Sequence, residues 1–457
     1  MSLLEKNPEF KKNIWLEIST QRLIMMPLIL LMVILLASMS PLGNTYDKLT
    51  NISYFGMVVI LLFWGSKVAY SNIIQEYNDR TWDWQRMSIL TPKQLIVGKL
   101  IGAPIYNWYG AVICLLLVFI FGVMGEYSSI LDIIVNSVST LLLGISLLSV
   151  SILFALLKIR EGNGRDKLKT GQIFILLILF CFFFNSSAFS FMFNRLSVSA
   201  KNFNTWKVFG ENLFYAIWAI IGLHQVLRRE LNYKNKSYLW VLFLVTSSFV
   251  KTIVLMDSMS VIIDNYVFVY FVILSMQAIS LFYLLLLIEQ NEISSLKILL
   301  RKIKEKNYPY LNYNAPLWSL TFPFIVIGLI SSWILFDKNI LRFEDLWTQE
   351  IINNIKIEAG IDSFETLSLL LSLLFFILRD FLIMLLLQTT SKKKRIGAAF
   401  ILYLFLLYVV FPGFTTSLGS KSIGLQLFIP LPIVGSFFYP LFECVVLFLI
   451  IRNKFKK

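Results

Sequence analysis

Long apolar runs, separated by short polar segments, occupy almost the whole chain. About 20 apolar residues suffice for a helix to cross a bilayer, and a helix satisfies its own backbone hydrogen bonds where lipid offers no partner. The pattern therefore predicts an all-α polytopic membrane protein. Twelve runs qualify, at about 23–39, 52–70, 101–124, 130–157, 171–193, 208–227, 237–256, 262–288, 317–336, 364–389, 396–412 and 427–451.

Composition agrees with the run pattern. The chain is 57% hydrophobic and only 15% charged, whereas soluble domains are about 45–50% apolar and about 25% charged. A chain of 457 residues would otherwise suggest about three soluble domains. Residues 1–22 are polar and lack the cleavage pattern of a signal peptide. We therefore expect the first span to serve as the insertion signal.

The basic residues predict an orientation. If the N-terminus is cytoplasmic, 30 of the 41 Lys and Arg residues fall in cytoplasmic segments and 8 in external loops. Cytoplasmic loops of membrane proteins carry such an excess, so we predict that both termini are cytoplasmic. The same bias accounts for the formal net charge of +14. Membrane lipid is therefore an expected partner and nucleic acid is not.

A weak internal repeat relates the two halves of the chain. Trp15 and Glu76 are 61 residues apart, and so are Trp318 and Arg379. This spacing favours two fused bundles of the six-helix type, although chance similarity between apolar helices is an alternative. We expect a first bundle at 1–230 with a cytoplasmic loop at 75–100, an intervening helix pair at 231–290, and a second bundle at 291–457.

An external amphipathic helix is predicted at about 340–360. Apolar residues at Phe343, Trp347 and Ile351 follow a helical spacing, and Gly360 is a plausible end. Such a helix would lie on the outer membrane face. It could gate an exit path or simply cover the ends of the neighbouring spans.

The loop at 75–100 interrupts two apolar runs with "QEYNDRTWDWQRMSILTPKQLIVGKL". In helical projection Trp82 and Trp84 lie on different sides, so the segment lacks the single apolar stripe of a helix that only rests on a membrane. Tryptophan is a frequent anchor at protein interfaces. Thr91-Pro92 then breaks the element and starts a new helix. We interpret this loop as a protein-docking element, with an interfacial aromatic belt as the alternative.

This loop resembles the cytoplasmic loop of type-2 ABC transporter permeases. The matching positions are Glu76, Arg80-Thr81, Ser88, Thr91-Pro92 and Gly98-Lys99. The resemblance implies the membrane subunit of an ABC exporter in the cytoplasmic (inner) membrane, whose coupling helix docks on a cytosolic ABC ATPase, expected in two copies. The docking residues would be Glu76, Asp79, Arg80, Thr81, Trp82, Asp83, Trp84, Met87, Thr91 and Pro92.

The resemblance also implies where the ATP chemistry resides. The glycine-rich "EGNGRDKLKTG" at 161–171 lacks the spacing of a phosphate-binding loop. We therefore expect no cofactor on this chain, no enzymatic activity of its own, and ATP and Mg²⁺ on the partner subunit. Permeases of this family commonly have six spans and act as dimers. Twelve spans could place both halves in one polypeptide, and a homodimer stays open as well.

Ionisable residues inside predicted spans are the other candidates for function, because burying charge in a membrane is costly. Arg379, Asp380 and Glu443 are of this kind. If the tenth span ends near Leu387, Arg379 and Glu443 could form a buried pair. The internal repeat suggests instead that this span ends near Leu378 and that an interfacial helix follows.

Two other functional classes stay open at this stage. An ion-coupled secondary transporter suits twelve spans with both ends inside, and a polytopic membrane transferase would need convergent acid, base or metal-binding residues. The single His224 lies near a span end. Cys114, Cys181 and Cys444 lie within apolar runs and are expected to be small core residues. No metal site is predicted.

Overall fold

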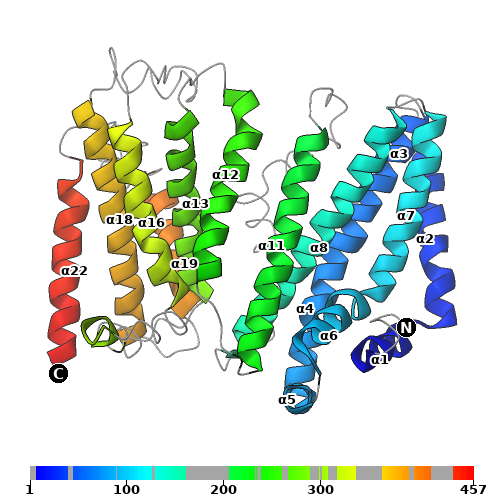
Figure 1. The fold of residues 1–457 in the computed structure, drawn as a ribbon, viewed down its shortest axis with the longest axis horizontal. Coiled ribbons are helices and arrows are strands. Elements are labelled where there is room, and N and C mark those ends of the chain that lie inside the picture. Colours follow the sequence, from blue (N-terminus) through cyan, green and yellow to red (C-terminus); the bar gives the residue numbers. More distant parts are fainter. Residues whose placement is uncertain are drawn as a thin grey trace. The chain divides into compact units, whose positions relative to one another are not determined.

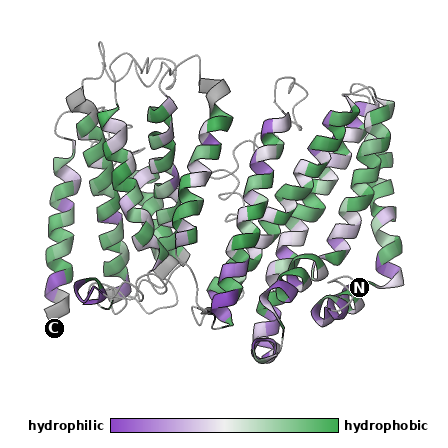
Figure 2. Ribbon diagram, viewed as in Figure 1, coloured by the Kyte–Doolittle hydropathy of each residue, from purple (hydrophilic) through white to green (hydrophobic). Residues whose placement is uncertain are grey.

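The regular structure of the described residues is entirely helical. The computed structural model describes residues 7–39, 45–88, 90–125, 129–160, 205–231, 233, 238–259, 266–288, 298, 301–306, 316–335, 363–390, 396–412 and 436–456. Figure 1 gives the course of the helices, and Figure 2 shows that hydrophobic residues cover most of their length. This confirms the all-α class and a multi-pass membrane protein by helix length and composition.

Eight described helices are long and apolar enough to cross a membrane. They coincide with eight of the twelve predicted spans. The predicted span at 171–193 lies outside the described residues, as do the external helix at 340–360 and residues 413–435. The eight are Thr20–Ser38, Thr45–Asn78, Ile105–Met124, Ile130–Ile159, Tyr238–Leu255, Tyr266–Leu287, Leu317–Ile334 and Leu367–Gln388.

Three further predicted spans are helical, but their described helices are not long and apolar enough to count as membrane-crossing. Helix α11 (Thr205–Glu230) carries Glu211 and two arginines in its last turn, which lowers its hydropathy. In the predicted span at 396–412, the apolar helix is only Ala399–Val410. The last predicted span, 427–451, is described from residue 436, and its helix begins at Phe438. The predicted count of twelve is thus supported in part, and the cytoplasmic location of the termini stays a prediction.

The chain divides into two compact units, unit 1 at Met1–Lys236 and unit 2 at Ser237–Lys457. The helix pair expected as a separate intervening segment belongs to unit 2. Its second helix packs extensively on the next helix of that unit, which explains the grouping. The division falls close to the predicted end of the first bundle at residue 230.

Unit 1 begins with a short helix that lies across the ends of the longer ones (Figure 1). Asn7 caps it by accepting hydrogen bonds from the backbone N–H groups of Glu9 and Phe10, with Pro8 in the first turn. The helices of unit 1 are α1 (Pro8–Glu17), α2 (Thr20–Ser38), α3 (Thr45–Met57), the π-helical η1 (Val58–Gly65), α4 (Ser66–Asn78), α5 (Thr81–Met87), α6 (Pro92–Val97), the π-helical η2 (Gly98–Gly102), α7 (Ile105–Met124), α8 (Ile130–Arg160) and α11.

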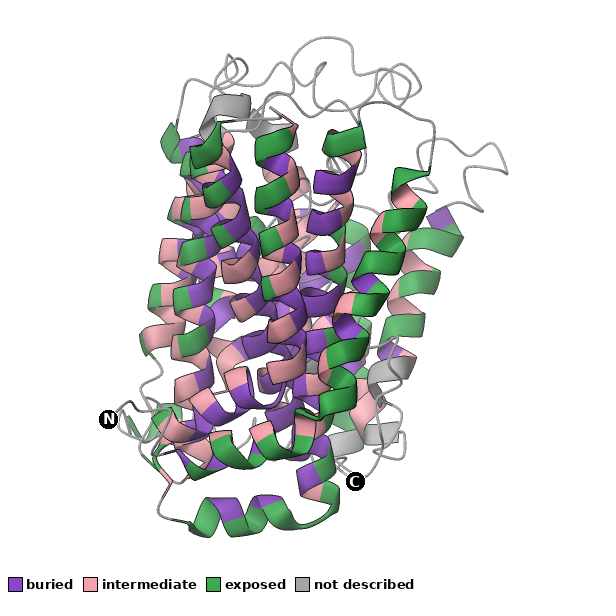
Figure 3. Ribbon diagram, turned by 90° about the vertical axis from the view of Figure 1, so that its right-hand side faces the viewer, coloured by how far each residue is buried: buried purple, intermediate pink, exposed green. Residues whose placement is uncertain are grey.

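The core of unit 1 lies between α3, η1, α4, α7, α8 and α11. Buried positions line the sides on which these helices meet (Figure 3). Tyr54, Val118 and Ile133 form one apolar cluster, and the Tyr54 hydroxyl donates to the Ile133 carbonyl at 3.2 Å. The Asn107 amide donates to the Ile60 carbonyl in η1 at 2.9 Å. A side chain thus satisfies a backbone group where the hydrogen-bond register of the helix changes.

Unit 2 is a bundle of helices. Helix α13 packs on α12 and α16, and α18 packs on α16, α19 and α22. The rings of Phe282, Trp318 and Phe381 meet between α13, α16 and α18, with the last two centroids 4.9 Å apart. The helices are α12 (Tyr238–Met259), α13 (Tyr266–Ile288), α16 (Leu317–Ile334), α18 (Ser363–Thr390), α19 (Ile396–Phe405), the π-helical η5 (Leu406–Val410) and α22 (Phe438–Lys456).

Candidate functional sites at α5 and α18

The predicted docking loop folds into two short helices, α5 and α6. Helix α4 ends at Asn78, and Arg80 adopts a left-handed backbone conformation with φ of 60° that turns the chain into α5. The Thr81 hydroxyl donates to the Glu76 carbonyl across this turn at 3.1 Å. Thr91 and Gln94 form a capping box with Pro92 in the first turn of α6. The predicted break at Thr91-Pro92 is confirmed.

Helix α5 has one buried side and one exposed side. The side chains of Trp82 and Gln85 are buried, and Trp82 is only 1% exposed. Trp84 and Met87 are 74% and 75% exposed. The two tryptophans therefore lie on different sides of the helix, as the projection predicted. Arg86 on the outer side donates to the Glu230 carbonyl of α11 at 3.1 Å, which ties α5 to a second helix.

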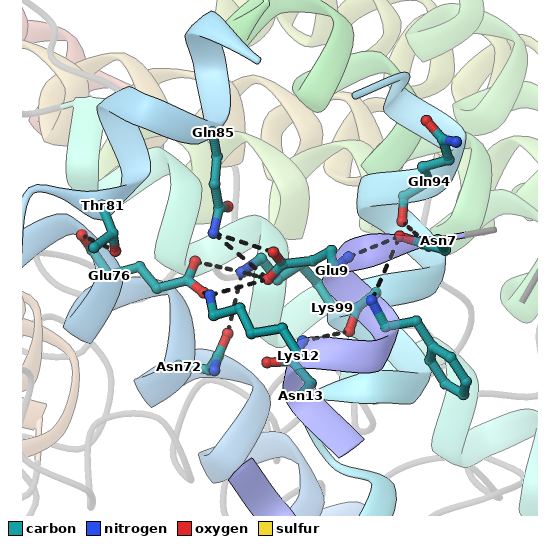
Figure 4. A network of polar contacts seen from close by, with 12 residues as sticks. Asn7, Glu9, Lys12, Asn13, Asn72, Glu76, Thr81, Gln85, Gln94 and Lys99 are labelled. Atoms are coloured by element: carbon teal, nitrogen blue, oxygen red, sulfur yellow. Dashed lines mark hydrogen bonds and ion pairs between the residues drawn. The ribbon is translucent and has the colours of Figure 1, made fainter. Parts of the chain in front are cut away.

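Behind α5, four charged side chains form a compact network (Figure 4). The Lys99 ammonium lies 2.7 Å from Glu9 Oε1 and also contacts Glu76 Oε2. Lys12 lies 3.0 Å from Glu76 Oε1 and 3.5 Å from Glu9 Oε1. Gln85 of α5 donates to Glu9 at 3.4 Å. The network therefore joins α1, α4, α5 and η2 with two positive and two negative charges.

The electrostatics of the network favour the charged forms of Glu9 and Lys12. Burial acts to raise the pKa of Glu9, but the attraction of Lys99 and then of Lys12 outweighs burial, so this pKa lies below its ordinary value. Burial acts to lower the pKa of Lys12, and Glu76 and Glu9 more than offset that effect, so this pKa is raised. Both shifts keep α1 ionically attached at neutral pH.

Helix α1 approaches η2 closely because glycine occupies the contact. A Cβ atom at Gly98 would lie 2.6 Å from Glu9 Cγ and 2.9 Å from Glu9 Cβ, closer than real contacts allow. Asn13 of α1 donates to the Gly98 carbonyl at 3.0 Å. Asn7 donates to the Gln94 carbonyl at 2.7 Å. The Gly-Lys pair quoted in the resemblance thus has a physical role, with Gly98 admitting α1 and Lys99 pairing with it.

The structure separates the predicted docking residues into two groups. Glu76 and Trp82 are buried, so neither is available at the surface of α5 in this conformation, and Pro92 is half-buried. The exposed members are Asp79, Arg80, Thr81, Asp83, Trp84, Met87 and Thr91. Glu9, Lys12 and Gln85 also belong to the network but were not predicted, because no local signal links a position near the N-terminus to one 64 to 90 residues later.

A second polar cluster lies in unit 2. Arg379 Nη1 donates to Glu443 Oε2 at 3.0 Å, and Arg379 Nε and Nη2 both donate to Asp380 Oδ1 at 3.2 Å. The hydroxyls of Tyr283 and Tyr408 donate to Asp380 Oδ2 at 2.6 and 2.7 Å. The cluster therefore links α13, α18, η5 and α22 through Arg379 and Asp380, two neighbouring residues of α18.

The pairing of Arg379 with Glu443 is one of the two arrangements that the sequence left open. Helix α18 continues without a break to Thr390, so Arg379 lies inside a long helix rather than at its end. The interfacial helix suggested by the repeat is therefore not formed. Arg379 and Asp380 are fully buried, whereas the Glu443 side chain is 44% exposed.

Metal chemistry gains no support from the described part of the chain. No group of three or more His, Cys, Asp or Glu side chains that could hold a metal ion occurs there. Cys114 is buried and Cys444 is half-buried, and both are reduced.

Three comparisons with known proteins, against protein-family models, curated proteins and solved structures, found no match for this chain.

Proposed function

We propose that the chain is the membrane-spanning subunit of an ATP-driven ABC exporter, on which a separate cytosolic ATPase acts through α5. The observation that carries this proposal is the two-sided character of α5. Its outer side presents an exposed tryptophan and methionine next to charged groups, and its inner side is held by a buried network. Exposed aromatic and methionine side chains of this kind are enriched at protein interfaces.

The contacts of α5 suggest how a push on it would spread. Thr81 ties α5 to the end of α4, Gln85 contacts α1 through Glu9, and Arg86 binds the end of α11. Three helices that start or end near α5 are thus connected to it by hydrogen bonds. A displacement of α5 would be transmitted to the long helices of unit 1, because packed helices move as rigid bodies.

ATP and Mg²⁺ would be bound by the partner, which we expect in two copies. The residues that would meet it are the exposed members of the predicted set, above all Trp84 and Met87. Trp82 and Glu76 would act from behind the interface by positioning α5. This division of roles refines the docking set inferred from the sequence.

Site-specific photo-cross-linking in native membranes tests the proposal. A photoreactive amino acid at position 84 or 87 should cross-link a protein whose sequence contains a phosphate-binding loop. The same group at position 206, an exposed tryptophan at the first turn of α11, is the control. Arg86 of α5 contacts α11 at Glu230, the last residue of α11. Position 206 is in the first turn of α11 and therefore lies at the end of α11 that is far from α5.

The complex purified from the same membranes supplies a second measurement. Its ATPase activity should co-purify with the wild-type chain and decrease strongly with Trp84→Ala/Met87→Ala. The matched variant Trp206→Ala should retain it. Equal cross-linking at positions 84 and 206, or full ATPase recovery with the double variant, would refute docking at α5.

A second candidate function is an ion-coupled secondary transporter. The observation that favours it is the charged cluster of Arg379, Asp380 and Glu443, since intramembrane charges often mark ion pathways. Purified chain in proteoliposomes without any ATPase distinguishes the two. Substrate movement driven by an imposed pH or sodium gradient would favour the secondary transporter over the ABC subunit.

A further inference from the structure

The charged cluster of unit 2 contains more negative than positive charge. Arg379 contributes one positive charge, and Asp380 and Glu443 contribute one negative charge each. Charges within a membrane protein are usually compensated by a partner, because an isolated one is costly there. With all three groups ionised, the cluster has one more negative than positive charge among the described residues.

The excess charge resides on Glu443. Asp380 is fully buried and accepts four hydrogen bonds, two from Arg379 and one from each of Tyr283 and Tyr408. Glu443, by contrast, accepts one hydrogen bond from the described residues, at 3.0 Å from Arg379. Its side chain is also 44% exposed. Arg379 and Asp380 therefore form a neutral interior pair, and the Glu443 carboxylate is the part of the cluster that another molecule can reach.

The surface beside Glu443 is aromatic and aliphatic. Phe442 precedes it and is 69% exposed, while Tyr439 and Val446 lie four positions before and three positions after it and are exposed as well. Tyr439 and Val446 therefore share one side of α22 with Glu443, and Phe442 lies on the adjoining side. Aromatic rings next to a carboxylate are complementary to a cation that carries an apolar body, since the ring faces also attract positive charge.

We propose that Glu443 and the exposed aromatic rings beside it bind a lipophilic organic cation. Its positive group would pair with the carboxylate, and its apolar body would cover Phe442 and Tyr439. Ca²⁺ or Mg²⁺ is a poorer fit because each takes six or more ligands, mostly oxygen atoms, and the described residues hold no metal-binding group of three acidic, His or Cys side chains. The proposal rests on the proposed function in one respect. If the chain is an exporter subunit, the cation bound at Glu443 would be the exported cargo.

Equilibrium dialysis of the purified full-length chain in nonionic detergent tests this site with radiolabelled tetraphenylphosphonium as the probe. The wild-type chain should bind it saturably. Glu443→Gln should weaken binding by about tenfold or more, and Glu443→Asp should retain most of it. Phe442→Ala, which keeps all charges, should weaken binding less. Glu305→Gln, which removes an exposed carboxylate elsewhere in unit 2, is the matched control and should bind like wild type.

Several results would overturn the site. They are an affinity of Glu443→Gln equal to that of wild type, no saturable binding of tetraphenylphosphonium, equal binding of the anion tetraphenylborate, and displacement by Mg²⁺ but not by dodecyltrimethylammonium. Size-exclusion elution and helix content establish that Glu443→Gln is folded, which we expect because Arg379 keeps Asp380 as its partner. If tetraphenylphosphonium still binds but positions 84 and 87 cross-link no ATPase, the proposed ABC function is refuted and the cation site is not.

Discussion

Replacement of Lys99 by methionine should detach α1 from the rest of unit 1. Lys99 is 1% exposed and contacts both Glu9 and Glu76, and Asn72 accepts from it at 3.4 Å. Without it, two carboxylates share the partly exposed Lys12. At the 2.7 Å separation from Glu9, an effective dielectric constant of about 20 gives a gross attraction of about 6 kcal/mol.

The net loss should be smaller than this attraction. Charges that are separated recover part of their hydration, and breaking a buried ion pair typically costs about 3–5 kcal/mol. Lys12 still compensates one carboxylate, so we expect about 3 kcal/mol. For a unit of this size each kcal/mol lowers the melting temperature by about 2–4 °C. The expected decrease for Lys99→Met is therefore about 6–12 °C.

The buried Cys114 provides the assay, because it lies in unit 1 and reacts with a fluorogenic maleimide only when the unit opens. The measurement uses a chain in which Cys181 and Cys444 are alanine. Lys67→Met, which removes an exposed lysine of the same unit, should change the melting temperature little. Glu9→Gln/Lys99→Met removes one charge of each sign and should recover much of the loss.

The reasoning fails in either of two cases. If Lys99→Met has the same melting temperature as the Lys67→Met control, the network does not stabilise unit 1. If the double variant with Glu9→Gln is no more stable than Lys99→Met alone, the loss arises from shape rather than from an uncompensated charge.

Three further changes probe the same region. Gly98→Ala should cost about 1–3 kcal/mol of stability by overpacking against Glu9, and it should speed tryptic cleavage within α1. The control Gly210→Ala places a Cβ atom where nothing lies within 4 Å, so it should change neither stability nor cleavage. Trp82→Phe should melt near wild type because the indole N–H of Trp82 has no hydrogen-bond partner in the described part of the chain, whereas Trp82→Ala should cost about 3–5 kcal/mol; equal losses would contradict this. The lowered pKa of Glu9 contributes stability that is complete above its ordinary value of 4.5 and is lost as the pH falls through the lowered value. The raised pKa of Lys12 contributes stability that is complete below pH 10.5 and is lost as the pH rises further. Tryptic cleavage of α1 should therefore be slowest between pH 4.5 and pH 10.5. A melting temperature that does not change with pH would argue against both contributions.

Local patterns predicted the helices well because their causes are local. Apolar length identified eight spans, and Thr91 followed by Pro92 marked the start of α6 through a capping box. The projection of α5 placed Trp82 and Trp84 on different sides. It did not say which side would be buried, because that depends on where α4 and α6 direct α5.

The partners of the charged residues were harder to predict because they are distant in the chain. Glu9 and Lys99 are 90 residues apart, and Arg379 and Glu443 are 64 apart. The sequence marked Arg379 and Glu443 as unusual, since charge inside an apolar run is costly, yet it left their pairing as one of two arrangements. A continuous α18 decided between them.

The sequence by itself determined that this chain is a helical membrane protein and that residues 75–100 interrupt it with a polar, aromatic loop, because length, hydropathy and capping act over a few turns. Only the tertiary structure decided what lies behind that loop. The Lys99 side chain meets Glu9 because glycine at position 98 admits α1 to within contact distance. Similarly, Glu443 is the accessible carboxylate of the Arg379 cluster, because Asp380 is buried and hydrogen-bonded to the tyrosines of α13 and η5. Both outcomes depend on packing between segments that no local pattern relates.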